Sequence, residues 1–168
     1  RKVNGWLRDP AAELAEGLDL ARRAVELGRD DAVALTRGAH ALGHFTGDLA
    51  IAVAALDRSL LLNPNLAATW FLGGYLRIWL GESEVAQAHF ARAMRLSPLD
   101  PELFRMQAGV AMAHLFAGRF DEASSWAAKA AQNLPSFLLA VGVLAASHAQ
   151  AGRAAEGRAS CSPPSVCR

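Results

Sequence analysis

The chain has 168 residues, about the size of one domain, and 52% of them are hydrophobic, so it can build a sizeable core. Its 17 basic and 16 acidic residues leave a formal net charge of +1, which provides no basic surface for nucleic acid or for an anionic membrane. The weakly polar runs 66–76 and 137–146 are shorter than the roughly 20 residues that a membrane span needs. We therefore expect neither a nucleic-acid partner nor a membrane partner.

The chain begins Arg-Lys-Val-Asn, without an initiator methionine, an apolar leader or a cleavage site. We therefore expect a fragment of a longer protein, with a cytoplasmic location. Residues 1–9 are an N-terminal lead-in, because Asp9 and Pro10 together are typical of a helix start. Residues 10–29 are expected to form one partial repeat, with leucine, alanine and valine at helical spacing over 10–28 and an end at Gly28.

A repeat of about 34 residues organises the rest of the chain. Four glycines are separated by 34, 37 and 34 residues, and three prolines by 34 and 37. After each of the first three glycines, an alanine follows at five residues and a proline twelve residues later: Gly47, Ala52, Pro64; Gly81, Ala86, Pro98; Gly118, Ala123, Pro135; the fourth glycine is Gly152. Glycine can take the left-handed conformation that ends a helix, alanine lets two helices approach, and proline stops the second helix. Each copy therefore predicts a helix, a tight turn and a second helix, as in stacked helical hairpins.

These copies resemble the tetratricopeptide repeat (TPR) family. The best match is residues 67–100, where the consensus slots hold Trp70, Gly73, Gly74, Gly81, Ala86, Phe90, Ala93 and Pro98. Arg77 stands in the slot that usually holds tyrosine. The resemblance covers roughly residues 30–155. It implies an all-α fold, a right-handed α-α superhelix of about three full helical hairpins with partial repeats at both ends.

The expected repeats are 30–66, 67–100 and 101–137, followed by a partial repeat over 138–160 and a flexible tail over 161–168. Their helices are expected at 31–46 and 48–62, 66–80 and 82–97, 101–117 and 119–133, and 136–151 with a short remnant from 153. Acidic or hydroxyl residues beside the glycines should serve as N-caps or as first-turn carboxylates of the second helices: Asp48, Glu82, Ser83 and Asp121. Asp100 should cap a helix begun by Pro101. Cys161 and Cys167 lie in the tail and lack the partners of a disulfide framework or a metal site.

The resemblance also implies a concave groove, lined by the first helix of each pair. Its groove-facing slots hold Arg37, His44, Phe45, Phe71, Tyr75, Ile78, Trp79, Arg105, Met112, Leu115 and Phe116. Aromatic residues and arginine concentrate binding energy at interfaces, and a peptide or an amphipathic helix would fit such a groove. The alternative is a packing role, in which these aromatic residues belong to the core or the groove holds the chain's own terminal helix.

The histidines offer little chemistry. His40 and His44 lie four residues apart on one helix face, a spacing that two metal ligands can use, but the sequence identifies no third ligand. His40 takes the slot of a small residue at a helix crossing, which we interpret as a buried core histidine. His114 and His148 occupy equivalent slots in successive copies, which indicates packing. No nucleophile and base pair or phosphate-binding loop stands out, so we predict a non-enzymatic protein with no catalytic residue, cofactor or metal.

Two classes of function remain. The first is a protein-interaction scaffold that binds a protein or peptide in its groove. The second is a regulatory TPR appendage of a multidomain bacterial signalling protein. Gly5, Trp6, Asp9 and Pro10, with the runs 18–27 and 30–32, resemble the repeat region of some bacterial class III adenylate cyclases or of related winged-helix regulators. The truncated last copy leaves an apolar face that predicts a weak homodimer through this end repeat: Leu138, Leu139, Val141 and Val143.

Overall fold

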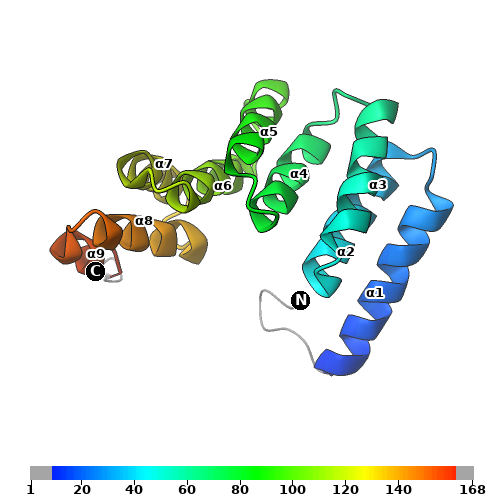
Figure 1. The fold of residues 1–168 in the computed structure, drawn as a ribbon, viewed down its shortest axis with the longest axis horizontal. Coiled ribbons are helices and arrows are strands. Elements are labelled where there is room, and N and C mark those ends of the chain that lie inside the picture. The colour runs from blue at the N-terminus through cyan, green and yellow to red at the C-terminus, as the bar shows by residue number, and fades with distance from the viewer. Residues whose placement is uncertain (1–8, 162–168) are drawn as a thin grey trace.

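The computed structural model describes residues 9–161, and this part of the chain consists of helices joined by short turns (Figure 1). The helices are α1 (Pro10–Leu27), α2 (Ala32–Thr46), α3 (Leu49–Leu62), α4 (Ala67–Trp79), α5 (Ser83–Leu96), α6 (Leu103–Phe116), α7 (Phe120–Asn133), α8 (Leu138–Gln150) and α9 (Ala154–Cys161). Each lies inside a helical range that the sequence predicts. The lead-in 1–8 and the tail from 162 onward lie outside the described residues, whereas Cys161, assigned above to the tail, ends α9.

The helices form a right-handed α-α superhelix that curves into an open arch (Figure 1). Each helix packs against the next one in the chain, and the first helices of neighbouring pairs, α2, α4, α6 and α8, also contact one another. One end of the arch carries α1, α2 and α3, and the other carries α8 and α9. The first helices therefore form a continuous inner layer, as the repeat pattern requires.

The turns within the helical pairs are made by glycines with a left-handed backbone. At Gly81 and Gly118 the φ angles are +79° and +75°, a region that residues with a Cβ rarely adopt. After Gly81 the backbone N–H of Glu82 donates to the carbonyl of Arg77 at 2.9 Å, which satisfies a carbonyl at the end of α4. The predicted glycine stops are therefore confirmed by the backbone geometry.

The predicted helix caps are confirmed only in part. The side chain of Asp9 accepts a hydrogen bond from the N–H of Ala12, and that of Asp48 accepts one from Ile51. Glu82 takes the N-cap position of α5, but its carboxylate pairs with Arg77 at 2.9 Å and makes no capping hydrogen bond. At Glu82 the ion pair with Arg77 across the turn takes the place of a side-chain cap.

The helix that the sequence places at Pro101 begins two residues later. Asp100 accepts a hydrogen bond from the N–H of Glu102 at 2.9 Å, so its side chain closes a short turn instead of capping a helix at Pro101. The helix α6 then begins at Leu103. The three extra residues of this copy are therefore absorbed in a loop, and the stack continues.

Small residues and large apolar residues alternate in the core. The alanines expected at helix crossings, Ala52, Ala86 and Ala123, are fully buried. The ring of Phe90 is also fully buried and packs in a cluster with Phe71, Tyr75 and other residues of α4, α5 and α6. Close helix crossings therefore hold the arch in shape, while aromatic side chains fill the space between the crossings.

A cluster of buried hydroxyl groups joins the first two repeats. Thr36 lies 2.8 Å from the hydroxyl of Ser59 and 2.7 Å from that of Thr69, measured between oxygens. The hydroxyl oxygens of Thr36 and Ser59 also lie 2.7 and 2.8 Å from the carbonyl oxygen of Ala32, so the three hydroxyl protons are shared among these contacts. All three hydroxyl-bearing residues are at most 1% exposed, so mutual hydrogen bonds replace those lost to water.

Candidate functional site

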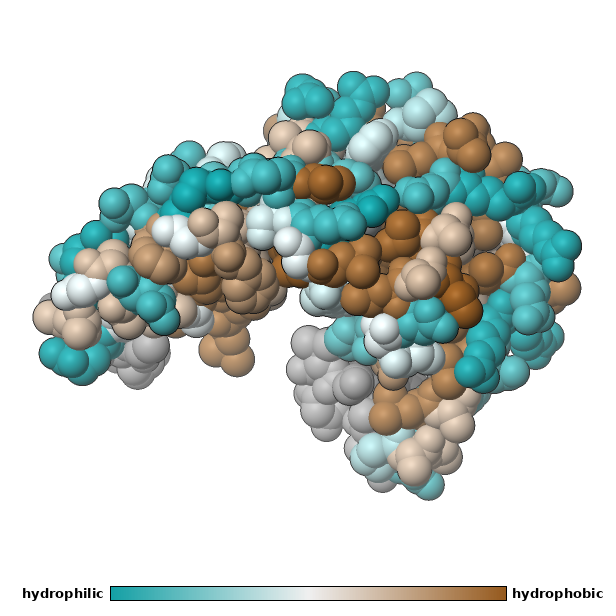
Figure 2. Space-filling view, in the orientation of Figure 1, coloured by the Kyte–Doolittle hydropathy of each residue, from teal (hydrophilic) through white to brown (hydrophobic). Residues whose placement is uncertain are grey.

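The inner side of the arch contains a groove with a volume of about 890 Å³. Figure 2 shows the molecule hollowed on this side, with hydrophobic side chains gathered along the inner edge. The walls come from α2, α4 and α6, from the connection between α7 and α8, and from the start of α8. The lining residues are His40, Ala41, His44, Phe45, Tyr75, Trp79, Glu102, Phe104, Arg105, Leu134, Phe137 and Leu139. A mostly aromatic and aliphatic wall with a few polar groups is typical of a binding site.

One wall of the groove is built by two histidines of α2 and by Trp79 of α4. His40 and His44 are four residues apart, so one face of the helix presents both rings. Their centroids lie 6.2 Å apart and their planes are within 3° of parallel. The Trp79 ring lies 5.6 Å from His40 and 5.8 Å from His44, and 36% of Trp79 is exposed. This wall therefore offers a ligand an accessible aromatic surface.

A second wall links α4 to α6. The hydroxyl of Tyr75 donates to the backbone carbonyl of Arg105 at 2.7 Å, which fixes the ring at the edge of the groove. The guanidinium of Arg105 lies 5.3 Å from the ring centroid of Phe71 and pairs with Glu102 at 2.5 Å. This wall therefore combines a rigid aromatic ring with a charged pair.

The electrostatic state of the groove follows from burial. Burial, together with the charges of His44, Arg105 and Arg37, lowers the pKa of His40 from 6.5 to about 4. Burial also raises the pKa of Tyr75, so its hydroxyl stays protonated and keeps donating. At neutral pH, His40 is therefore uncharged, and it presents an aromatic and hydrogen-bonding surface to the groove.

Five of the eleven residues predicted to face the groove line it. His44 and Phe45 of α2, Tyr75 and Trp79 of α4, and Arg105 of α6 all border it, as the repeat register predicts.

The other predicted groove residues lie elsewhere. Phe71 and Ile78 are only 6% and 4% exposed and belong to the core beneath the groove, because they point between helices. Met112 is half-buried against the same core, and Leu115 packs against a neighbouring cluster. Arg37 and Phe116 are exposed but do not line the groove.

Several lining residues were not predicted. His40, interpreted as a buried core histidine, is half-buried, and its ring also borders the groove and stacks with His44. A helical wheel of α2 contains the signal, because residues 40, 41, 44 and 45 share one face. Leu134 and Phe137 come from the connection before α8, and their position depends on how that connection folds, which no spacing rule in the sequence specifies.

The repeated histidines make hydrogen bonds at the turns. Nδ1 of His114 accepts from Nε of Arg119 at 2.9 Å, and Nδ1 of His148 accepts from Nε of Arg153 at 3.2 Å. Burial lowers the pKa of His114, and the charge of Arg119 lowers it further. In each pair a turn glycine lies between the histidine and the arginine, and the arginine directly follows that glycine. The packing role predicted for these histidines therefore includes a hydrogen bond across the turn.

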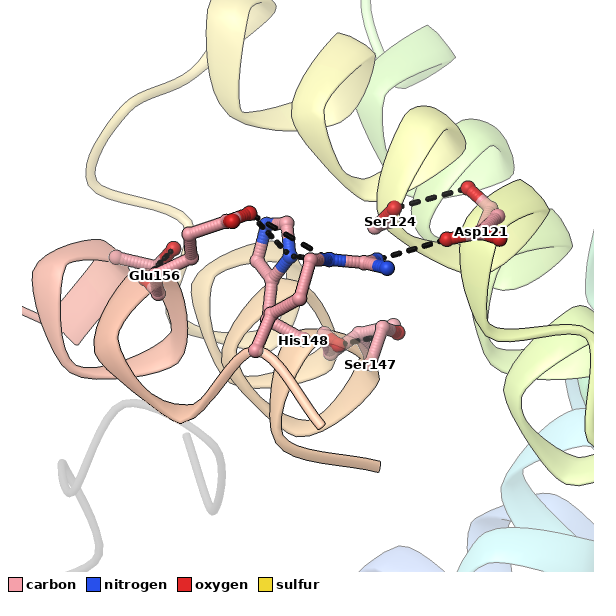
Figure 3. Close-up of polar contacts among 8 residues, drawn as sticks. Asp121, Ser124, Ser147, His148 and Glu156 are labelled. Atoms are coloured by element: carbon pink, nitrogen blue, oxygen red, sulfur yellow. Dashed lines mark hydrogen bonds and ion pairs between the residues drawn. The ribbon is translucent and has the colours of Figure 1, made fainter. Parts of the chain in front are cut away.

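The same arginines connect successive repeats. Arg153 reaches back to Asp121 at 2.8 Å, and Arg119 reaches back to Glu84 at 2.6 Å. Figure 3 shows the last of these junctions, where His148 and Glu156 converge from α8 and α9 and Asp121 approaches from α7. Nδ1 of His148 lies 3.2 Å from the Glu156 carboxylate. The ion pairs of Arg153 with Asp121 and Glu156 connect the final helix to the stack.

The described residues provide few other candidate sites. Within residues 9–161, no group of three or more histidine, cysteine, aspartate or glutamate side chains is arranged to hold a metal ion. None of the helices in this range has both the length and the apolar composition that a membrane crossing needs. A smaller cavity of about 290 Å³ lies between α1, α2 and α3 and is lined by Arg22, Val25, Glu26, Leu42, Thr46, Asp48 and Ile51.

Comparison with known proteins identifies the fold. No protein-family model and no curated protein sequence matches the chain. Solved structures do match: a tetratricopeptide repeat protein from Parabacteroides merdae has a TM-score of 0.72 at 19% identity, covering 89% of this chain and 57% of that one. MamA, from residue 41 to its end, from Desulfovibrio magneticus RS-1 has a TM-score of 0.71 at 17% identity, with 88% and 81% covered. PilF of Pseudomonas aeruginosa has a TM-score of 0.65 at 14% identity, with 88% and 72% covered. The chain therefore has the fold of a TPR solenoid.

Proposed function

We propose that this protein is a non-enzymatic interaction scaffold that binds a peptide or a helix of a partner protein in its concave groove. The observation that carries the proposal is the groove itself, about 890 Å³ with aromatic side chains on its walls. Trp79 is 36% exposed there, although an indole ring gains free energy when it is buried. A partner that covers Trp79 would gain this free energy.

The rigidity of the groove supports the same proposal. The hydrogen bond from Tyr75 to Arg105 and the tilted contact between the rings of His40 and Trp79 fix the walls before any ligand arrives. Walls that are already ordered lose little conformational entropy on binding. A pre-organised aromatic groove therefore suits a partner segment that itself has to become ordered.

The experiment that tests this proposal uses a photocrosslinking amino acid in place of Trp79. The matched control carries the same amino acid in place of Val85, which lies on α5 outside the groove lining and is 42% exposed. We expect a discrete crosslinked partner from position 79 and none from position 85. Binding of that partner, measured again with purified proteins, should be lost in Trp79→Ala and kept in Val85→Ala.

Equal crosslinking from both positions, or equal binding by both alanine variants, would overturn the proposal. Circular dichroism of each variant checks that it is folded. Tyr75 is a poorer choice of variant, because it is 7% exposed and its hydroxyl bonds to α6, so its removal would disturb the stack.

The alternative function, a regulatory TPR appendage of a multidomain bacterial signalling protein, would use the same groove to bind another part of its own polypeptide. It rests on the sequence resemblance to the repeat region of adenylate cyclases and winged-helix regulators, which the structural comparisons do not support. In that case the segment captured at position 79 would belong to the same longer polypeptide. Mass spectrometry of the crosslinked segment distinguishes this outcome from capture of a separate protein.

A further inference from the structure

The charged pair in the groove is accessible to a competing ligand. Arg105 and Glu102 are the ion pair of the groove wall, and their side chains are 39% and 42% exposed. An ion pair that remains in contact with water contributes little stability. A carboxylate from a ligand can therefore replace Glu102 beside Arg105 at small cost.

Arginine is well suited to such an exchange. Its guanidinium has five N–H donors in a fixed plane, and the contact with Glu102 that the structure records involves Nη1. The same guanidinium lies over the ring of Phe71, which holds its position from below. A ligand carboxylate would therefore meet an arginine that is already oriented.

Other basic side chains lie near Arg105 and the groove. The charges that lower the pKa of His40, after burial, are those of His44, Arg105 and Arg37. Arg37 is exposed on the same helix as His40. Basic side chains therefore lie near His40, beside the uncharged aromatic surface of Trp79.

We propose that the groove selects acidic segments, in which an aspartate or glutamate accompanies apolar or aromatic residues, and that Glu102 competes with the ligand carboxylate for Arg105. This inference rests on the proposed peptide-binding function and adds the chemistry of the occupant. The apolar side chains of such a segment would stack on Trp79, while its carboxylate would take the place of Glu102.

The test uses a display library of random 12-residue peptides with blocked termini, so that any negative charge comes from side chains. Selection on the intact chain should enrich peptides that carry aspartate or glutamate next to apolar residues. Affinities of the selected peptides are then measured for Glu102→Gln and Arg105→Gln. We expect Glu102→Gln to tighten binding severalfold and Arg105→Gln to weaken it by roughly ten- to a hundredfold.

Matched controls separate charge from folding. Glu82→Gln removes a paired glutamate of similar exposure, 41%, that does not line the groove, and should leave affinity unchanged. Arg105→Lys keeps the positive charge and should recover part of the lost affinity. The effects of both groove variants should shrink as salt is added.

The outcomes are distinguishable. If the selected peptides lose affinity in Trp79→Ala but carry no acidic residue, the groove is a binding site and the charge preference is wrong. If Glu102→Gln weakens binding, Glu102 contacts the ligand favourably and is not a competitor, which also overturns the inference. If the intact chain retains no peptide more strongly than the Trp79→Ala variant does, both this inference and the proposed function fail.

Discussion

The ring of Phe90 lies so close to the backbone of Gly109 that a Cβ atom at this glycine would be 2.3 Å from Cζ of the ring. On the neighbouring first helix, a Cβ at Gly74 would be 2.6 Å from the same atom. The ring is therefore clamped between α4 and α6 at positions without side chains. Because Phe90 is fully buried, it cannot move aside into solvent.

Gly109→Ala should destabilise the protein. Alanine gains about 1 kcal/mol in helix propensity over glycine, but overpacking against a buried ring costs about 1–3 kcal/mol and the contact at 2.3 Å is severe. We expect a net loss of about 1–2 kcal/mol in the free energy of unfolding, measured by chemical denaturation.

The matched control for this prediction is Gly142→Ala. Gly142 lies inside α8, and a Cβ there would meet no atom within 4 Å. Helix propensity alone then acts, and the variant should be more stable by about 0.5–1 kcal/mol. Stabilisation by both substitutions would show that Phe90 does not clamp α6.

The buried hydroxyl cluster should respond unequally to single and triple replacement. Thr36→Val removes the hydroxyl that contacts both Ser59 and Thr69 and leaves those groups with fewer partners away from water. We expect a loss of about 1–3 kcal/mol, because a buried polar group without a partner keeps its desolvation cost.

Replacing the three hydroxyls together, as Thr36→Val with Ser59→Ala and Thr69→Val, should cost less than the sum of the single variants. Ala32 and residue 36 both belong to α2, so the carbonyl of Ala32 still accepts the helical N–H four residues later and remains satisfied. A double-mutant analysis of unfolding free energies measures the difference. Strict additivity would mean that the three hydroxyls do not act as a unit.

The acid sensitivity of the protein should depend on His40. Its pKa is about 4 in the folded state and 6.5 in the unfolded state, so between these values the unfolded state binds more protons. Stability is therefore unaffected above pH 6.5, falls as the pH drops from about 6.5 to 4, and levels off below that. At about 1.4 kcal/mol per pH unit, the loss is roughly 3 kcal/mol over the whole window.

His40→Phe keeps an aromatic ring beside Trp79 and cannot titrate, so it should be less sensitive to acid than the parent protein over this window. Burial also lowers the pKa of His89, but that residue is present in both proteins and its contribution cancels in the comparison. Unfolding free energies at pH 7, 5.5 and 4 check the prediction. Parallel pH profiles of the two proteins would contradict it.

Much of the fold could be predicted because local chemistry marks the helix ends. Gly81 and Gly118 require a backbone that other residues avoid, so their spacing reports the turns directly. The groove was harder to predict. His40 and Phe71 both lie on first helices, but His40 borders the groove and Phe71 lies in the core beneath it. Packing against neighbouring helices sets how each helix is rotated about its axis, and this rotation decides which side chains face the groove. Phe137 reaches the groove from a connection, whose path depends on the folded stack.

The register of the repeat is tested by introducing the same side chain at two alanines. Ala86 is fully buried at a helix crossing, so Ala86→Leu should overpack the contact between α4 and α5 and cost about 1–3 kcal/mol. Ala50 is exposed on α3, where leucine has space and a helix propensity close to that of alanine, so Ala50→Leu should change stability by less than about 0.5 kcal/mol. Thermal unfolding followed by circular dichroism measures both variants. Similar midpoints for the two would show that Ala86 does not lie at a close crossing, and the repeat register from Gly81 to Pro98 would then be wrong.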